Sequence, residues 1–138
     1  LSMQLHQSDV NKKYQDELER SIELLHKNKI HVSLFIDPTP EYVTISKKIG
    51  VKQIEINTAA YADGDLSGIN RIKETCAIAK ELELECAAGH GLTHHNLHLL
   101  VHEVPDISEY NIGHSIIARA VFCGLEQPVR DIRDIIEK

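Results

Sequence analysis

The sequence lacks a net positive charge and any long apolar run, and each absence argues against a class of partner. Fifteen Lys and Arg against 21 Asp and Glu give a formal charge of −6. A general nucleic-acid binder would instead carry a basic face. The longest apolar runs are a few residues, far short of the ~20 that span a bilayer. We therefore expect neither a nucleic acid nor a membrane among its partners.

Paired cysteines are also missing. Cys76, Cys86 and Cys123 form no CxxC pair and are odd in number, which is typical of reduced, mostly buried thiols in a cytosolic protein. Residues 1–13, LSMQLHQSDVNKK, lack the basic, apolar and small-residue regions of a signal peptide. We therefore expect a cytoplasmic protein.

The pattern of apolar residues predicts one domain in which strands and helices alternate. The chain has 138 residues, and 42% of them are hydrophobic, which is enough for a real core. After a first helix, strand–helix units follow with strands beginning near residues 31, 52, 84 and 108. The expected segments are a helix at 12–27, a strand at 31–37, a helix at 39–49, a strand at 52–58, a polar loop at 61–68, a helix at 66–82, a strand at 83–89, a helix closed by Pro105, a strand at 108–113, and a helical end that is interrupted at Gly124 and restarts at Pro128 with Val129, Ile132 and Ile136 inward.

Such alternation implies parallel strands with crossover helices. The strands read as mostly apolar on both faces, as in a sheet covered on both sides. No Gly-rich dinucleotide fingerprint follows the first strand, which lowers the case for a nucleotide-binding doubly wound sheet. Four units are half of an eight-stranded barrel of about 250 residues, and the first helix has no predicted strand before it. We expect the C-terminal half of such a barrel; a self-standing four-stranded α/β domain is the alternative.

The carboxyl ends of all four predicted strands carry polar residues or glycine, where ligands bind in parallel strand–helix folds. Helix caps alone explain part of this pattern.

Glu55 lies inside the apolar strand QIEIN. If Ile54 and Ile56 face the helices, Glu55 points to the interior, where a carboxylate must be paired or functional. A salt bridge or a solvated sheet edge is the structural alternative.

Two further stretches at this rim suggest chemistry. His90 lies between two glycines, which allow close approach of a ligand, and imidazole passes protons near neutral pH. In NIGHS, residues 111–115, a glycine precedes a helix start. The amides of Gly113, His114 and Ser115 could bind phosphate there. The alternatives are a turn histidine satisfied by the backbone, and a tight turn capped by Ser115.

Three other histidines are spaced like one helical stripe. His94, His98 and His102 fall at i, i+4 and i+8. They lack the intervening carboxylate of the H-E-x-x-H zinc motif, and the leucines and valines of this segment occupy the core face. We therefore predict a solvated stripe on the helix after His90 and no metal.

Four blocks, VSLFIDP, IEINTAAYAD, AAGHGLTHHN and EYNIGHSIIARAVFCGL, resemble the C-terminal half of the pyridoxine 5′-phosphate synthase family. They follow in family order over about residues 9–138. The resemblance implies a TIM (β/α)8 barrel, of which this chain covers roughly the last four units at 31–138, after a helix at 11–28. Residues 1–10 do not match the family's Gly-rich segment, and we treat them as a divergent leader.

The resemblance also implies an activity. The family condenses 3-amino-2-oxopropyl phosphate with 1-deoxy-D-xylulose 5-phosphate to pyridoxine 5′-phosphate, phosphate and water, without a metal or organic cofactor, as a homo-octamer. It implies His90 as proton donor, Glu55 as stabiliser of the transition state, Gly91 as a ligand contact, and Gly113 with His114 as the phosphate site. The family's other catalytic bases lie in the N-terminal half. We therefore expect the 138-residue chain to be inactive alone; a non-catalytic phosphate-binding or assembly module is the alternative.

Overall fold

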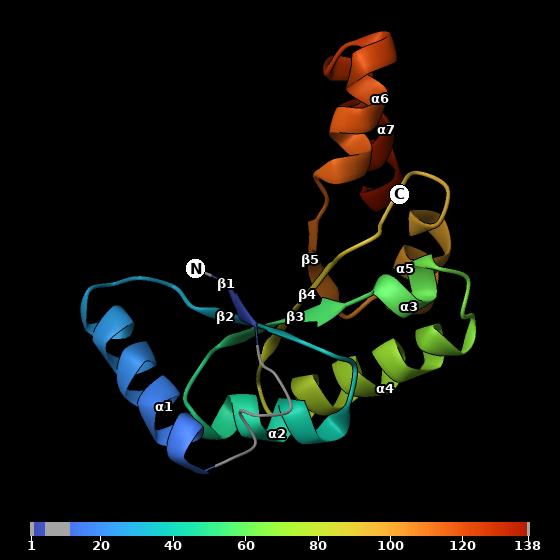
Figure 1. The fold of residues 1–138 in the computed structure, drawn as a ribbon. Helices are drawn as coiled ribbons and strands as arrows, with labels where there is room; N and C mark the ends of the chain where they lie inside the picture. Colours follow the sequence, from blue (N-terminus) through green and yellow to red (C-terminus); the bar gives the residue numbers. More distant parts are fainter. Residues whose placement is uncertain (1, 5–11, 138) are drawn as a thin grey trace.

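The computed structural model describes residues 2–4 and 12–137, and Figure 1 shows them as an α/β fold with one parallel sheet. The five strands lie in chain order, β1-β2-β3-β4-β5, each paired in parallel with the next. The elements are β1 (Ser2–Gln4), α1 (Lys12–Lys27), β2 (Ser33–Ile36), α2 (Pro40–Lys48), β3 (Gln53–Asn57), α3 (Ala59–Ala62), α4 (Ser67–Glu81), β4 (Glu85–Gly89), α5 (Leu97–Glu103), β5 (Ile107–Asn111), α6 (His114–Cys123) and α7 (Glu126–Ile136).

The predicted alternation is confirmed, but the expectation that no strand precedes the first helix is wrong. β1 pairs with β2 through the register Ser2↔Ser33 to Gln4↔Phe35. A three-residue strand held by backbone hydrogen bonds is too short to leave a period in the sequence. The rest of the expected leader, residues 1 and 5–10, lies outside the described residues.

The two faces of the sheet differ, which corrects the expectation that both are apolar. Leu34, Ile36, Ile54 and Ile56 are fully buried, in one core with apolar residues of α2 and α4. Figure 1 shows α2 and α4 running along one side of the sheet. Residues of the opposite parity point to the other side, because strand side chains alternate. That second face carries Gln53, Glu55 and Asn57 from β3, and Glu109 and Asn111 from β5, beside Phe35 of β2 and Ala87 of β4. It is more polar than the first face, and we call it the polar face.

Most residues predicted to face inward from α4 and α5 are buried, but the sequence did not predict the short helix α3. Ile72, Cys76 and Ala79 of α4 are buried, as are Leu97 and Leu100 of α5. The expected polar loop at 61–68 is wrong in two places. Residues 59–62 form α3, and α4 begins at residue 67.

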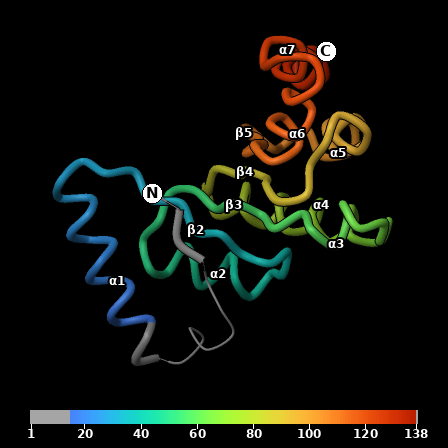
Figure 2. Tube along the Cα trace, turned by 45° about the horizontal axis from the view of Figure 1, so that its top comes forward, coloured from blue at the N-terminus to red at the C-terminus, as the bar shows by residue number. Residues whose placement is uncertain are grey.

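α6 and α7 form a helical pair that projects from the rest of the molecule, at the end opposite α1 in Figures 1 and 2. α7 begins at Glu126, before the predicted restart at Pro128. Ile132 is buried as predicted, but Val129 and Ile136 are exposed, and Ile135 is buried instead. α7 packs mainly on α5 and α6, which turns a different stripe inward.

No helix in the described residues has both the length and the apolar character needed to cross a membrane.

Candidate functional site

A cleft of about 470 Å³ opens between the segments that follow β4 and β5. Its lining consists of two short runs, His90, Gly91, Leu92 and Thr93 from the first segment and Asn111, Ile112, Gly113, His114 and Ser115 from the second. Parallel strands place their carboxyl ends at one edge, and β4 and β5 are neighbours in register. Four of the five predicted site residues, His90, Gly91, Gly113 and His114, therefore meet at one cleft.

Glu55, the fifth predicted residue, lies beside this cleft and is not part of its lining. It is half-buried, between the fully buried Ile54 and Ile56 of β3, and it projects from the polar face as predicted. Its carboxylate crosses over Gly89, the last residue of β4. A Cβ on Gly89 would lie only 2.3 Å from Glu55 Oε1 and 3.3 Å from Asn111 Cβ. Glycine at this position thus leaves the space through which Glu55 reaches toward β5.

His90 is exposed and has an unusual backbone conformation. Its φ is 82°, in the left-handed region that non-glycine residues adopt only when their surroundings enforce it. The imidazole ring lies near the ring of Phe35 of β2, with ring centroids 6.4 Å apart and an angle of 41° between the ring planes. Phe35 and Glu55 are directly paired across β2 and β3. The His90 ring therefore reaches back toward the part of the polar face that carries Glu55.

Thr58 holds the His90 backbone in place. It is fully buried, directly after β3, and its amide donates to Gly89 O at 2.9 Å. Its hydroxyl lies 2.9 Å from Gly89 O and 2.6 Å from His90 O, so its single proton serves these two carbonyls. The sequence placed Thr58 at a strand end without giving it a role. Its partners are more than thirty residues away, and no local pattern reports such a contact.

A second set of contacts fixes the chain after His90. Gly91 has φ 75°, and a Cβ there would lie 2.6 Å from Ala62 Cβ of α3. Asn96 spans the turn: its side-chain amide donates to Gly91 O at 3.1 Å, and its side-chain oxygen accepts from Thr93 N at 2.8 Å. Both the glycine and the turn are therefore needed for the course of this segment, and Asn96 is a further residue that sequence reasoning missed.

The segment after β5 ends in the first turn of α6. Gly113 is the N-cap residue with φ −128°, and no side chain caps the helix. The first amides of a helix have no partner within the helix and carry the positive end of its dipole. The sequence also suggests Ser115 as a cap, but its hydroxyl donates to Leu92 O at 2.8 Å. This bond joins the two walls of the cleft and leaves the helix start open to an anion.

The predicted histidine stripe is wrong in one position. His94 and His95 lie in the turn before α5, with ring centroids 3.7 Å apart, while His98 and His102 are exposed on α5. Desolvation and the positive charge of Arg119 hold the pKa of His94 below its ordinary value. Among the side chains that the structure describes, no group of three or more His, Cys, Asp or Glu could hold a metal ion.

Thr58→Val removes the hydroxyl while keeping the shape of the side chain. Because His90 O then lacks this donor in a part-buried setting, we expect a loss of about 1 kcal/mol in the free energy of unfolding and a shifted His90 amide resonance. Thr44→Val is the matched control, since Thr44 is exposed and bonds only to Pro40 O within its own helix. Urea unfolding and amide NMR spectra measure both effects. Equal stability of the two variants would contradict the role of Thr58.

Comparison with protein families gives one match over nearly the whole chain. The family model of the pyridoxal phosphate biosynthesis protein PdxJ matches residues 7–138. The pyridoxine 5′-phosphate synthase of Aliarcobacter butzleri is 37% identical over 150 residues, covering 88% of this chain and 57% of the relative. That of Idiomarina loihiensis is 44% identical over 114 residues, covering 79% and 47%. The chain thus spans about half the length of these relatives.

A solved structure supports the fold alone. The YdjI aldolase from Escherichia coli K12 superposes with a TM-score of 0.56 at 13% identity, covering 99% of this chain and 57% of the aldolase chain. This structural match supports only the fold, whereas the family model and the synthase relatives match the sequence and therefore identify the family. On that evidence, the chain belongs to the PdxJ family of pyridoxal phosphate biosynthesis proteins.

Proposed function

We propose that this chain supplies the last four strand–helix units of an eight-stranded barrel that acts as a pyridoxine 5′-phosphate synthase. The five parallel strands in chain order support this, because a (β/α)8 barrel is built from consecutive parallel strands joined by helices. The match to about half of each relative supports it too. The observation that carries the proposal is the meeting of His90, Gly91, Gly113 and His114 at one cleft, with Glu55 beside it across Gly89.

The proposed substrates are 3-amino-2-oxopropyl phosphate and 1-deoxy-D-xylulose 5-phosphate. Their condensation and ring closure involve amine addition to a ketone, loss of water and loss of phosphate. These steps need a group that gives and takes protons near neutral pH, and we assign that role to His90. Its ring is exposed, while its backbone is fixed by Thr58. A fixed backbone carrying an accessible ring suits repeated proton transfer to a bound ligand.

Glu55 has a different role in the proposal. Amine addition to a ketone develops positive charge at nitrogen, and a carboxylate held nearby stabilises that charge. Glu55 is kept in position by the β3 strand and by the missing side chain of Gly89. The amides at Gly113 and His114 anchor a substrate phosphate at the start of α6, and Gly91 lets the ligand approach His90. The proposal needs no metal or organic cofactor, and we place the reaction in the cytoplasm.

Because the chain matches only about half the length of its relatives, the activity test compares the chain alone with the chain plus the other half. We expect the 138-residue chain alone to form no pyridoxine 5′-phosphate from the two substrates. Co-expression with the complementary N-terminal segment of a family relative should restore product. In that assembly, His90→Gln should lower kcat by about 10²–10⁴-fold, because proton transfer contributes that much. His98→Gln on exposed α5 is the control. Product from the chain alone, or full activity of His90→Gln, would count against the proposal.

The phosphate site can be tested with one isosteric pair. Gly113→Asp and Gly113→Asn both place a favourable N-cap residue where a Cβ meets nothing within 4 Å, so neither should unfold the chain. The Asp carboxylate repels a phosphate dianion, and we expect it to weaken binding at least about tenfold more than Asn does. Calorimetric titration with 1-deoxy-D-xylulose 5-phosphate measures the difference. Equal affinities for the two variants would show that the phosphate binds elsewhere.

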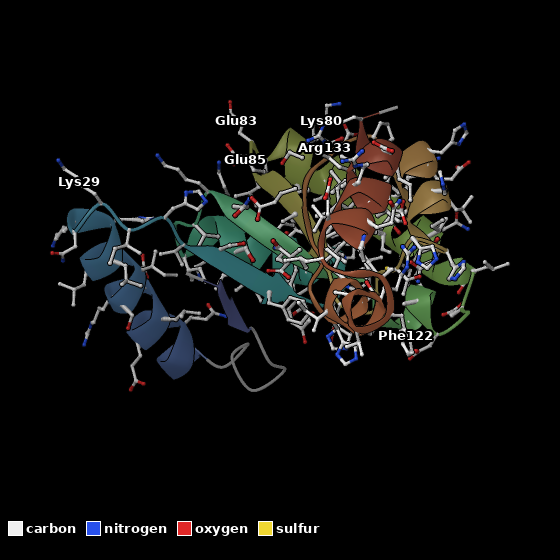
Figure 3. The ribbon with its side chains drawn as sticks, turned by 90° about the horizontal axis from the view of Figure 1, so that it is seen from above. Lys29, Lys80, Glu83, Glu85, Phe122 and Arg133 are labelled. Atoms are coloured by element: carbon white, nitrogen blue, oxygen red, sulfur yellow. The ribbon has the colours of Figure 1, made fainter. Side chains whose placement is uncertain are left out.

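We also propose that the protein works as a homo-oligomer, an octamer at full length. Support comes from apolar side chains that project from α6 and the turn after it: Val121 is 79% exposed and Phe122 is 91% exposed, with Ile117 and Leu125 also exposed. Figure 3 shows Phe122 pointing outward. An apolar patch of this kind marks an interaction surface.

Sedimentation tests the oligomer. We expect the protein, completed to the length of its relatives, to sediment above the monomer mass and Phe122→Ser to shift it toward smaller species. Leu66→Ser is the control, since Leu66 is 68% exposed but lies at the start of α4, away from α6. A monomeric parent protein would refute the proposal, and so would an equal effect of the two variants.

A further inference from the structure

Two of the three cysteines face each other beneath the surface, at the end of the sheet away from the cleft. Cys76 belongs to α4 and Cys86 to β4, and they are 1% and 3% exposed. Cys86 is the second residue of β4, whereas Gly89 ends the strand at the cleft. The proposed synthase chemistry uses neither thiol. The pair is therefore a separate feature from the site described above.

The two thiols interact directly. Hydrogen bonding between them is the largest influence on each: it raises the pKa of Cys76 and lowers the pKa of Cys86. Both thiols also line one cavity, which places them near each other in space. The carboxylate of Asp106 opposes ionisation of both groups. The two thiols thus titrate as a pair, and the first ionisation leaves one thiolate beside one thiol.

A surface cavity reaches the pair. It has a volume of about 360 Å³ and is lined by both cysteines together with Lys80, Asp106 and Ser108, among others. Lys80 and Asp106 pair at 2.6 Å, and the Ser108 hydroxyl donates to Cys86 O at 3.1 Å. Lys80, Glu83 and Glu85, which also line the cavity, extend from one side of the molecule in Figure 3. A small molecule can therefore approach two thiols that show almost no surface of their own.

We propose that Cys76 and Cys86 form an oxidisable dithiol, a modification site that a low-molecular-weight disulfide such as glutathione disulfide converts to an intramolecular disulfide. The Cys86 thiolate attacks one sulfur of the small disulfide and releases one small thiolate. The Cys76 sulfur, after losing its proton, attacks Cys86 and releases the second. Two S–H bonds are lost and one S–S bond forms, while the small disulfide gains two electrons and two protons and leaves as two thiols.

The third cysteine separates this reaction from ordinary surface oxidation. Cys123 is exposed at the end of α6 and lies on a different element from the pair. Its thiol reacts with an outside partner, giving a mixed or intermolecular disulfide. Removing it as Cys123→Ser leaves two thiols, both in the pair, from the three of the sequence. Because Cys123 is exposed, this substitution should not disturb the core.

The test uses the folded Cys123→Ser chain and glutathione disulfide. After acid quenching and denaturation, we expect free thiols to fall from two to none, with a linked Cys76–Cys86 peptide in the mass map and no retained glutathione. A reducing agent should return both thiols. The oxidised chain should also melt at a higher temperature, because the bond joins α4 to β4 and restricts the unfolded chain.

Cys76→Ser in the same background checks the order of events. Without the second sulfur, Cys86 should retain one glutathione, since nothing displaces it. The proposal is overturned if Cys123→Ser keeps two free thiols under conditions that oxidise the denatured chain, or if it carries glutathione on both cysteines. These results are independent of substrate turnover, so they stand apart from the proposed synthase function.

Discussion

The parallel pairing of β3 with β4 is the constraint on which the candidate site depends. Its register opposes Glu55 to Ala87 and Asn57 to Gly89, so both strands end at the same rim. Thr58 follows β3 directly, and its hydroxyl lies within hydrogen-bond distance of the carbonyls of Gly89 and His90 at the end of β4. A shift by one residue would turn Glu55 to the helical side. The β3–β4 register, Gly89 and the hydrogen bonds of Thr58 together position the segment that carries His90.

In the site that this pairing positions, backbone amides and side chains have different roles. In the proposed function, the open first turn of α6 binds a phosphate, while His90 transfers protons and Glu55 stabilises positive charge. The walls between them are fixed by side chains that bond to backbone: Thr58 to His90 O, Asn96 to Gly91 O, and Ser115 to Leu92 O. The exposed side chain of His90 thus extends from a backbone segment that several hydrogen bonds hold in place. Such preorganisation keeps reacting groups in position without a cost at each turnover.

Local patterns in the sequence were sufficient for the alternation of strands and helices. Mostly buried runs marked β2, β3 and β4, and helical spacing marked α1, α2, α4 and α5. The parity of QIEIN also predicted the face of Glu55. β1 and α3 were missed because each is too short for a period. Thr58 and Asn96 were missed for another reason: their bonds reach residues that only the tertiary fold brings near. His94 fell at helical spacing, yet the turn built by Asn96 places it outside α5.

The central claim of the proposed function is that this chain forms one side of a larger barrel, with its polar face toward the substrates. The most direct measurement is a crystal structure of the protein, completed to the length of its relatives, with 1-deoxy-D-xylulose 5-phosphate bound. The account predicts phosphate oxygens on the amides at Gly113 and His114, with the carbon chain directed between His90 and Glu55. A phosphate bound away from the start of α6, or a carbon chain directed away from His90, would contradict it.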